Sequence, residues 1–362
     1  MKISDKKEVI DYINELIETN NLNMSIGDML SELVGNRSVA SIKELTLLSE
    51  KFHRPIRDLL IDKCFDYYEL DDESEDDVEI FDQYIANSIV ETDVKKYLKN
   101  PYYKNIKIKN INYNGYSLRE DHYEPLELFS LYDMSRDGNF HEINSLSFFK
   151  ERFPFISLDY KGITWMSITP NEIETMDKAV KEARGKVIIY GLGLGYYPYM
   201  ISLKEEVKEV VIIEKGKNIL DIFNKYLLPQ FEHKEKIKVV YDDAFDYMKK
   251  DNSFDYAFID LWHDPFDGLS LWIKAKKLEK KGHQYFYWLE SSFYLLLRRC
   301  FLSLIEEQIA EAPESGYTKA KNITDEIINK YYFLTKDLEI KNKSQLDDLL
   351  SDSSLLNLLL NN

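Results

Sequence analysis

Three glycines lie at positions 191, 193 and 195, spaced two residues apart. Of the sequence patterns in this chain, this one is best suited to bind a ligand that takes part in a reaction. They follow the apolar run Val187–Tyr190 and precede a segment that can form a helix. A glycine lets the backbone approach a ligand closely, or adopt a positive φ that a side chain disfavours. The strand–turn–helix pattern therefore predicts the first unit of a doubly wound nucleotide-binding fold. Alone, a glycine triplet is a weak signal, since glycines also mark ordinary turns.

The spacing of the glycines narrows the class of ligand. A dinucleotide fingerprint needs its third glycine at position 196, where this chain has Tyr196. No Gly-Lys-Ser/Thr follows, which excludes a P-loop. The observed Gly-x-Gly-x-Gly resembles motif I of the class I S-adenosylmethionine (AdoMet) enzymes. We expect Gly191, Leu192, Gly193 and Gly195 to contact that cofactor.

Acidic residues end the apolar segments that follow the glycine turn. The first, Val207–Lys215, reaches Glu214 about 20 residues beyond the turn, where a carboxylate can accept both ribose hydroxyls. The next two segments end at Asp243 and Asp260. In an open parallel sheet such ends line the ligand crevice. One acid at a strand end is unremarkable, but the ordered series favours AdoMet. The residues expected at the cofactor beyond the turn are Glu214, Lys215, Asp243, Ala244, Asp260 and Leu261.

A particular set of elements must position these residues. We expect strands at 187–190, 207–215, 236–241, 254–262 and 283–290, and helices at 269–278 and 291–310. The predicted fold class is α/β: a Rossmann-like, doubly wound, mostly parallel sheet of the class I AdoMet-methyltransferase type. A small β-hairpin region and an N-terminal helical module precede it. No convincing sixth and seventh strands follow, although 331–340 is a weak candidate.

Composition excludes several classes of protein. The chain has 362 residues, a formal charge of −17 and only two cysteines, Cys64 and Cys300. The charge disfavours a nucleic-acid partner, whose phosphates would be repelled. The most apolar late stretch, 286–305, is interrupted by Glu290, Arg298 and Arg299, so no membrane span is expected. Two distant cysteines indicate a reduced, cytoplasmic protein without a cysteine-built metal site, and we expect no metal.

The first 70 residues are expected to be helical. Ser4 and Ser25 can each begin a helix, with Gly35 closing the second, and further helices are predicted from Ser41 and Pro55. No basic recognition helix is present, so an interaction or dimerisation module is favoured over a DNA reader. The run 69–79 has eight acids in eleven positions, which indicates a solvated linker.

Two hairpins are predicted between this linker and the glycine turn. Asn114-Gly115 lies between alternating segments, and Lys161-Gly162 divides 155–170 in the same way. Thr169-Pro170 then begins a helix. The leucine-rich end is expected to form a helix that packs on another element or on a second subunit. The predicted divisions are 1–70 (helical module), 71–80 (acidic linker), 81–170 (mixed region with hairpins), 171–312 (Rossmann-like AdoMet-binding domain) and 313–362 (helical extension).

The segment 155–290 resembles the spermidine-synthase-like aminopropyltransferases, a branch of the class I AdoMet enzymes. Their "LDG…T…E" hairpin corresponds to LDYKGITWMSITPNE here, their glycine loop to GLGLG, and their "D-x-x-DP" segment to DLWHDP. The resemblance implies AdoMet-type cofactor binding. However, this chain has Leu194 where their glycine loop carries an aspartate, and DLWHDP is one residue longer than DSSDP. Because a polyamine pocket needs carboxylates near each cationic nitrogen, these departures favour methyl transfer over aminopropyl transfer.

Methyl transfer requires alignment of the acceptor and, where needed, a base. We expect Asp260 to orient the acceptor or the cofactor's ammonium group, and His263 to take the acceptor's proton, because a histidine titrates near neutral pH. The alternative for His263 is a loop histidine with one structural hydrogen bond. Trp165 and Trp262 could contact the acceptor, but core packing is the favoured interpretation for both.

Three functions therefore stay open. The leading one is an AdoMet-dependent methyltransferase with a small, unidentified acceptor. A spermidine-synthase-like aminopropyltransferase is the first alternative, and a catalytically silent AdoMet-binding or assembly protein the second. The terminal helical regions could mediate homo-oligomerisation.

Overall fold

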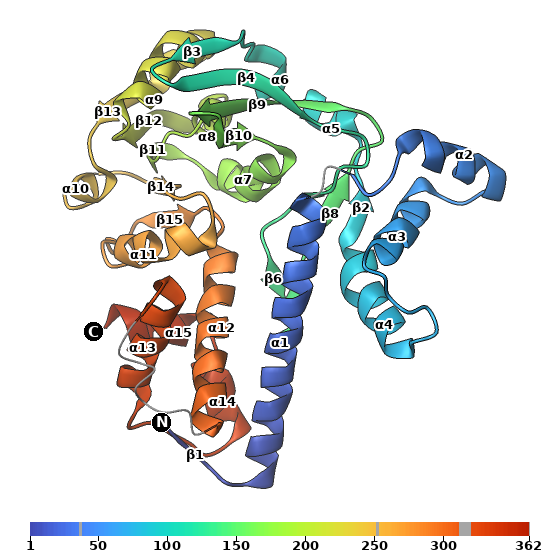
Figure 1. The fold of residues 1–362 in the computed structure, drawn as a ribbon. Helices are drawn as coiled ribbons and strands as arrows, with labels where there is room; N and C mark the ends of the chain where they lie inside the picture. Colours follow the sequence, from blue (N-terminus) through green and yellow to red (C-terminus); the bar gives the residue numbers. More distant parts are fainter. Residues whose placement is uncertain (36–37, 251–252, 311–319, 362) are drawn as a thin grey trace.

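The computed structural model describes residues 1–35, 38–250, 253–310 and 320–361. At its centre lies a parallel sheet with strand order β13-β12-β11-β14-β15 (Figure 1). The strands are Ile237–Tyr241 (β13), Val207–Glu214 (β12), Gly185–Tyr190 (β11), Tyr256–Ile259 (β14) and Gln284–Tyr287 (β15). The chain moves outward from β11 to β13 and returns to β14, so the strand order reverses between β11 and β14. Doubly wound folds bind ligands at such a reversal, outside the carboxyl ends of the strands. The predicted fold class is confirmed.

The strands of this sheet are apolar along their length because both faces are covered. Ile189 of β11 lies in register between Ile212 of β12 and Phe258 of β14, and all three are at most 1% exposed. The helices that connect the strands are α8 (Tyr196–Ser202), α9 (Lys217–Ile222), α10 (Ala244–Met248) and α11 (Pro265–Lys276). α11 begins before the predicted residue 269 because Asp264 caps it, accepting hydrogen bonds from the backbone N–H groups of Phe266 and Asp267.

A second, antiparallel sheet has the order β10-β9-β4-β3. Its strands are Ile111–Tyr113 (β3), Tyr116–Tyr123 (β4), Phe153–Tyr160 (β9) and Ile163–Ile168 (β10). Both predicted hairpins are present, with positive φ at Asn114, Gly115, Lys161 and Gly162. Two positive-φ residues in a two-residue loop are what a type I′ hairpin requires. Helix α7 (Pro170–Glu182) follows β10, as the Thr169-Pro170 pair predicts.

The N-terminal region departs from the prediction of two helices. One continuous helix, α1, spans Lys7–Gly35, and Ser25 lies inside it with its hydroxyl donating to the Asn21 carbonyl. The polar middle of α1 does not interrupt it, because buried Asn23 donates to the Phe140 carbonyl and accepts from the Glu142 N–H. The two halves of α1 contribute to separate hydrophobic clusters, so this helix joins them.

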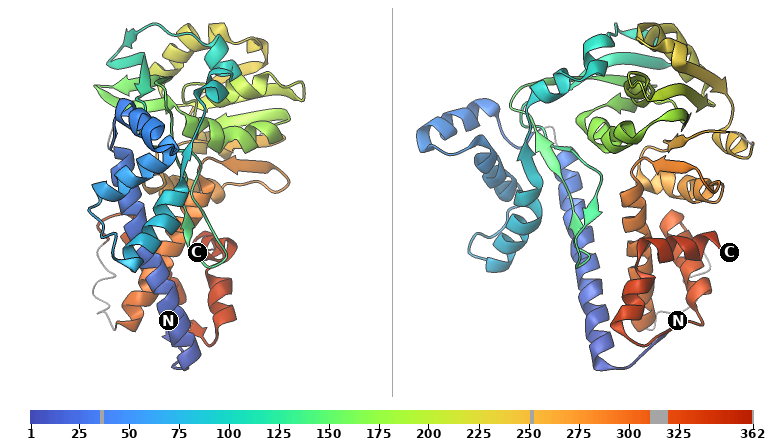
Figure 2. Two further views of the ribbon diagram at one scale, coloured as in Figure 1. Left: turned by 90° about the vertical axis from the view of Figure 1, so that its right-hand side faces the viewer. Right: turned by 180° about the vertical axis from the view of Figure 1, so that it is seen from behind.

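Helices α2 (Ile42–Phe52) and α3 (Ile56–Tyr67) form where predicted. The acidic run is not a plain linker: it includes helix α4 (Glu75–Ile80), whose N-terminus is capped by the Ser74 hydroxyl. The views from front and back both place these helices beside α1, away from the C-terminal helices (Figure 1 and Figure 2). Short elements lead from α4 to β9: η1 (Phe81–Ile85), η2 (Ala86–Ser88), β2 (Ile89–Glu91), α5 (Val94–Leu98), α6 (Pro101–Asn105), β5 (Phe129–Ser130), β6 (Ser135–Arg136), β7 (Glu142–Ile143) and β8 (Leu146–Phe148).

Over residues 290–310 and 320–361, the C-terminal region is mainly helical and adds no strand to the central sheet. Its helices are α12 (Glu290–Ile309), α13 (Ile323–Thr335), α14 (Lys343–Leu349) and α15 (Asp352–Leu360). The candidate strand at 331–340 is wrong: α13 takes its first half, and Glu339–Ile340 (β16) pairs instead with Lys2–Ile3 (β1). The tail forms two helices rather than one. The predicted boundary at 312/313 lies outside the described residues. Over the described ranges, no helix is long and apolar enough to cross a membrane.

Candidate functional site

A cavity of about 480 Å³ lies at the carboxyl ends of the central strands. Its floor includes the glycine turn after β11 and the residues that follow β12, β13 and β14, while the β10 edge of the second sheet and α7 contribute the opposite wall. This volume is within the range typical of small-molecule sites. The structure brings these predicted site residues together in the cavity lining: Gly191, Leu192, Gly193, Glu214, Lys215, Asp243, Ala244, Asp260, Leu261 and His263.

The three glycines have different surroundings. All have positive φ (94°, 55° and 78° for Gly191, Gly193 and Gly195). A Cβ atom on Gly191 would lie 1.8 Å from the Asp260 carbonyl oxygen, so this glycine allows two strand ends to meet. A Cβ on Gly193 would meet nothing within 4 Å. Gly195 is outside the cavity lining, and a Cβ atom on it would lie 2.7 Å from the Phe223 ring, so its cofactor contact stays a prediction.

Glu214 links the glycine turn to the turn after β12. Its Oε2 accepts from the Leu192 N–H at 3.2 Å, and its Oε1 accepts from the Gly216 N–H at 2.5 Å. A carboxylate has about four lone-pair positions, so two remain for hydroxyl donors. Glu214 is therefore both part of the scaffold and a group able to accept from a ribose.

Asp243, like Glu214, is both part of the scaffold and able to accept a hydrogen bond from a ligand. Its Oδ1 accepts from the backbone N–H groups of Phe245 (2.9 Å) and Asp246 (3.2 Å), which caps α10. Both bonds use one oxygen, and Oδ2 can accept from a ligand amine. Ala244 beside it is buried, while Lys215 is exposed at the cavity rim.

Asp260 and Glu172 form the other acidic part of the lining, and Glu172 was not predicted as a site residue. Neither carboxylate forms a hydrogen bond or ion pair with any residue that the structure describes. Burial, together with the negative charge of Glu214, raises the pKa of Asp260 to about 7. Burial and the charge of Asp260 raise the pKa of Glu172 well above its usual range. Glu172 is the last residue of LDYKGITWMSITPNE, so the motif could have indicated it.

His263 lies at the cavity mouth. Its side chain is 45% exposed, and its Nδ1 is 2.8 Å from Oδ2 of Asp267. The rings of His263 and Trp165 are 4.6 Å apart between centroids at 73°. Trp165 is 41% exposed, which contradicts its predicted core packing. Trp262 is buried as expected, with its indole N–H donating to the Trp288 carbonyl.

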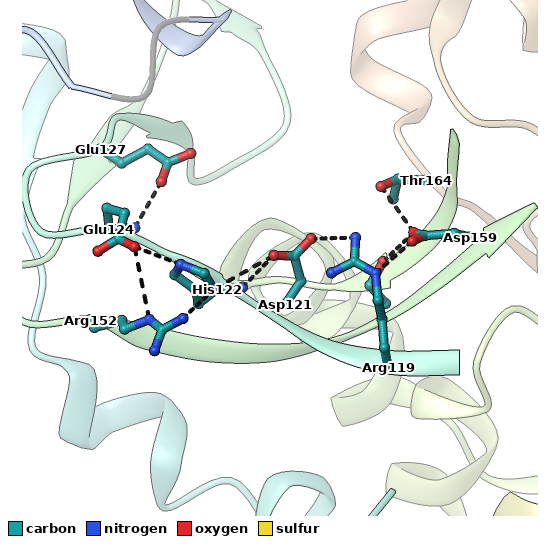
Figure 3. A network of polar contacts seen from close by, with 9 residues as sticks. Arg119, Asp121, His122, Glu124, Glu127, Arg152, Asp159 and Thr164 are labelled. Atoms are coloured by element: carbon teal, nitrogen blue, oxygen red, sulfur yellow. Dashed lines mark hydrogen bonds and ion pairs between the residues drawn. The ribbon is translucent and has the colours of Figure 1, made fainter. Parts of the chain in front are cut away.

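A polar network fixes the hairpin wall of the cavity (Figure 3). Thr164, a lining residue, donates to Oδ1 of buried Asp159, and Arg119 donates to its Oδ2 at 2.5 Å. Arg119 also contacts Asp121 at 2.8 Å. Hydrogen bonds to Asp159 and Asp121 raise the pKa of Arg119, so the guanidinium stays charged and holds β4 to β9.

Metal binding finds no support in the described part of the chain, where no three His, Cys, Asp or Glu side chains are grouped to hold an ion.

Comparisons with known proteins give limited information. No family model matches the sequence, and no curated protein matches it. Among solved structures, spermidine synthase from Thermotoga maritima shows 15% identity and a TM-score of 0.29, over 46% of this chain and 68% of that one. A spermidine synthase in complex with the transition state analogue AdoDATO shows 16% identity and a TM-score of 0.29, over 48% and 68%. Similarities this low assign neither a family nor an activity to this chain.

Proposed function

We propose that this protein is an AdoMet-dependent methyltransferase acting on a small acceptor. The observation that supports this most is the composition of one cavity. It combines a glycine turn, two carboxylates bonded to the turns of the scaffold (Glu214 and Asp243), and two carboxyls without such bonds (Glu172 and Asp260). The first pair suits a nucleoside and the second a reacting acceptor.

The residues present fit the cofactor. Asp243 Oδ2 would accept from the adenine amine, and the remaining lone pairs of Glu214 would accept from the ribose hydroxyls. The open space above Gly193 admits a ligand against the backbone. Leu192, Lys215, Ala244 and Leu261 complete the surrounding surface.

A sulfonium cofactor supplies a methyl group that is already activated for transfer. The chain then has to align the acceptor and remove a proton. Asp260 faces the cavity as an acceptor of hydrogen bonds and, with a pKa near 7, as a base. His263 is the second candidate base. If its Nδ1 donates to Asp267, the ring presents Nε2 as a proton acceptor.

Aminopropyl transfer is the second candidate because an acidic cavity also suits a decarboxylated, more cationic nucleoside. Leu194 argues against it. This side chain is 2% exposed and lines the cavity where the aminopropyltransferase motif has an aspartate, so it offers no charge to an ammonium group.

The test compares the melting temperature of the full chain with AdoMet, decarboxylated AdoMet, methylthioadenosine and NAD. A ligand that binds only the folded state raises the melting temperature by mass action. We expect AdoMet to give the largest increase. A larger increase with decarboxylated AdoMet, and consumption of putrescine, would support aminopropyl transfer. Stabilisation by NAD alone would contradict the proposal, and AdoMet binding without turnover on any acceptor would favour the silent protein.

A further inference from the structure

The strand order divides the cavity into two halves. Asp243 and Glu214 lie at the ends of β13 and β12, and Asp260 and Trp288 lie at or beyond the ends of β14 and β15, with β11 between the pairs. Neighbouring strands are about 4.8 Å apart, so these side chains are arranged in this order across the sheet. A nucleoside over β12 and β13 leaves the space over β14 and β15 for the acceptor.

The walls of that remaining space are mainly apolar. Its lining includes Met166, Ile168, Met176, Trp262, Leu271 and Trp288. The two indole N–H groups are already used: Trp262 donates to the Trp288 carbonyl at 3.1 Å, and Trp288 donates to the Thr175 hydroxyl at 2.9 Å. The two tryptophans therefore offer the cavity aromatic carbon rather than hydrogen-bond donors. An apolar ligand body gains by displacing water from such walls.

Charge is concentrated at one place in this half. Glu172, in the first turn of α7, and Asp260, after β14, are the acidic residues of its described lining. The charge of Asp260 helps to raise the pKa of Glu172, the charge of Glu214 helps to raise that of Asp260, and no cationic side chain of the described chain is paired with Glu172 or Asp260. Because both carboxyls line the same cavity and neither is paired with a cation, a ligand cation bound between them would take the place of a proton that they hold.

We propose that the acceptor is an amine with a single positive charge and an apolar body, held at its nitrogen by Glu172 and Asp260. This inference rests on the proposed function, because a bound AdoMet nucleoside is what leaves this half of the cavity to the acceptor. A polyamine fits poorly, since its second ammonium would lie among Met176, Leu271 and Trp288 without a carboxylate. A neutral alcohol would leave the two carboxyls without a cation.

The residues of this half account for the proton and the electron pairs that move during methyl transfer to an amine. The bound ammonium loses one proton to one of the two candidate bases, Asp260 or His263, and becomes a neutral amine. Its nitrogen lone pair forms a bond to the methyl carbon as the carbon–sulfur bond breaks, and the sulfur keeps the electron pair as a neutral thioether. The product is a methylated ammonium ion, which the carboxylate that stays ionised can bind until it leaves.

The test measures binding by calorimetry on the full chain saturated with S-adenosylhomocysteine, so that no turnover occurs. The probes are 2-phenylethylamine, its neutral counterpart 2-phenylethanol, and the dication putrescine. We expect 2-phenylethylamine to bind at least roughly 10-fold tighter than the other two, because only it satisfies both the carboxyl pair and the apolar wall. Tighter binding of putrescine or of phenylethanol would overturn the inference.

Two isosteric variants, Glu172→Gln and Asp260→Asn, test the residues themselves. Each should weaken phenylethylamine roughly 10-fold or more and leave phenylethanol unchanged, because only the charge is removed. Asp177→Asn is the matched control: it lies on the same helix, is exposed and is outside the lining. Equal losses in all three variants would contradict the assignment.

A second measurement on the unmodified chain does not depend on variants folding. Binding of phenylethylamine at pH 7, followed in phosphate and in Tris buffer, should release a fraction approaching one proton as the cation takes its place. No proton release would overturn the inference. Amine binding without any AdoMet or S-adenosylhomocysteine binding would instead contradict the proposed function and leave the amine site standing.

Discussion

The two halves of the cavity use their carboxylates in opposite ways. Glu214 and Asp243 accept hydrogen bonds from backbone N–H groups, so they hold the turns that they occupy. Glu172 and Asp260 form no such bonds within the described chain, and burial raises the pKa of both. A group that stabilises the scaffold is expected in any fold, whereas a partly buried carboxyl without a partner costs stability. Such groups are retained chiefly where function needs them.

This contrast predicts that the same type of substitution has different effects in the two halves. Changes in the half that contains Glu214 and Asp243, here called the scaffold half, should lower both folding stability and cofactor affinity. Changes in the half that contains Glu172 and Asp260, called the acceptor half after its proposed ligand, should leave folding intact, or improve it, while altering acceptor binding and turnover. The variants below test that separation, with the expected losses in decreasing order and the one expected gain last.

The largest effect is expected from the glycine turn. Gly191→Ala would place a Cβ 1.8 Å from the Asp260 backbone oxygen at a φ of 94°, so we expect a loss of more than about 4 kcal/mol of folding stability. Gly193→Ala has space around its Cβ and should cost only about 1–2 kcal/mol for its positive φ. Denaturant unfolding of both variants measures this difference.

AdoMet affinity of the Gly193→Ala variant provides the second readout for the turn. Its added methyl group would extend into the open space of the cavity, so affinity should fall although the protein stays folded. Equal stability of the Gly191→Ala and Gly193→Ala variants would show that the close contact between β11 and β14 does not limit the residue at position 191, and would contradict this prediction.

The next effect concerns the two candidate bases in the acceptor half. If His263 takes the acceptor's proton, His263→Ala should lower the single-turnover rate by about 10²–10⁴ with AdoMet affinity and melting temperature unchanged. Asp267→Asn should give a smaller loss, since it keeps the ring position but weakens the Nδ1 contact. A normal rate in His263→Ala would remove this residue from the mechanism and leave Asp260 as the base.

Sequence patterns revealed the scaffold half more completely than the acceptor half. Glycines at positive φ and acids that end apolar strands have local signatures, because the turn and cap geometry itself demands those residue types. Both hairpins were predictable for the same reason, with Asn114-Gly115 and Lys161-Gly162 at the required positions. The roles of these residues toward a ligand stay predictions.

Other features depended on contacts between distant segments. Glu172 has the position of an ordinary first-turn acid, which the helix dipole favours, and only the packing of α7 over the sheet brings it into the same cavity as Asp260. The continuity of α1 depends on Asn23 bonding to Phe140 and Glu142, more than a hundred residues away. Trp165 was expected in the core, but it lies on β10, where its half-exposed ring contacts His263 at the cavity mouth.

Intermediate effects are expected in the scaffold half. Glu214→Ala removes the acceptor of the Leu192 and Gly216 N–H groups, which should cost about 1–3 kcal/mol in folding stability and a similar amount in AdoMet affinity. Asp243→Ala removes the cap of α10 and should cost about 1 kcal/mol of stability. Unfolding curves and calorimetry measure both quantities. Unchanged AdoMet affinity in Glu214→Ala would show that this residue serves the scaffold alone.

The last effect, and the one of opposite sign, is the pH dependence from Asp260. Its folded-state pKa of about 7 lies above the ordinary value of 3.8, so the folded protein binds more protons than the unfolded chain between these values. The proton bound to Asp260 contributes free energy to the stability of the folded state. This contribution is fully present below about pH 4 and is lost as the pH rises through 7. Asp260→Asn cannot ionise, so without ligand it should exceed the parent's stability by up to about 4 kcal/mol at pH 8 and by less, about 1–2 kcal/mol, at pH 5. Asp243→Ala should remain less stable than the parent at both values, because it loses hydrogen bonds rather than a repelled charge. Melting temperatures of the parent and the two variants at pH 5 and pH 8 test whether Asp260 differs from the scaffold carboxylates. If Asp260→Asn is destabilised at pH 8 as Asp243→Ala is, then Asp260 belongs with the scaffold carboxylates and the division of the cavity is wrong.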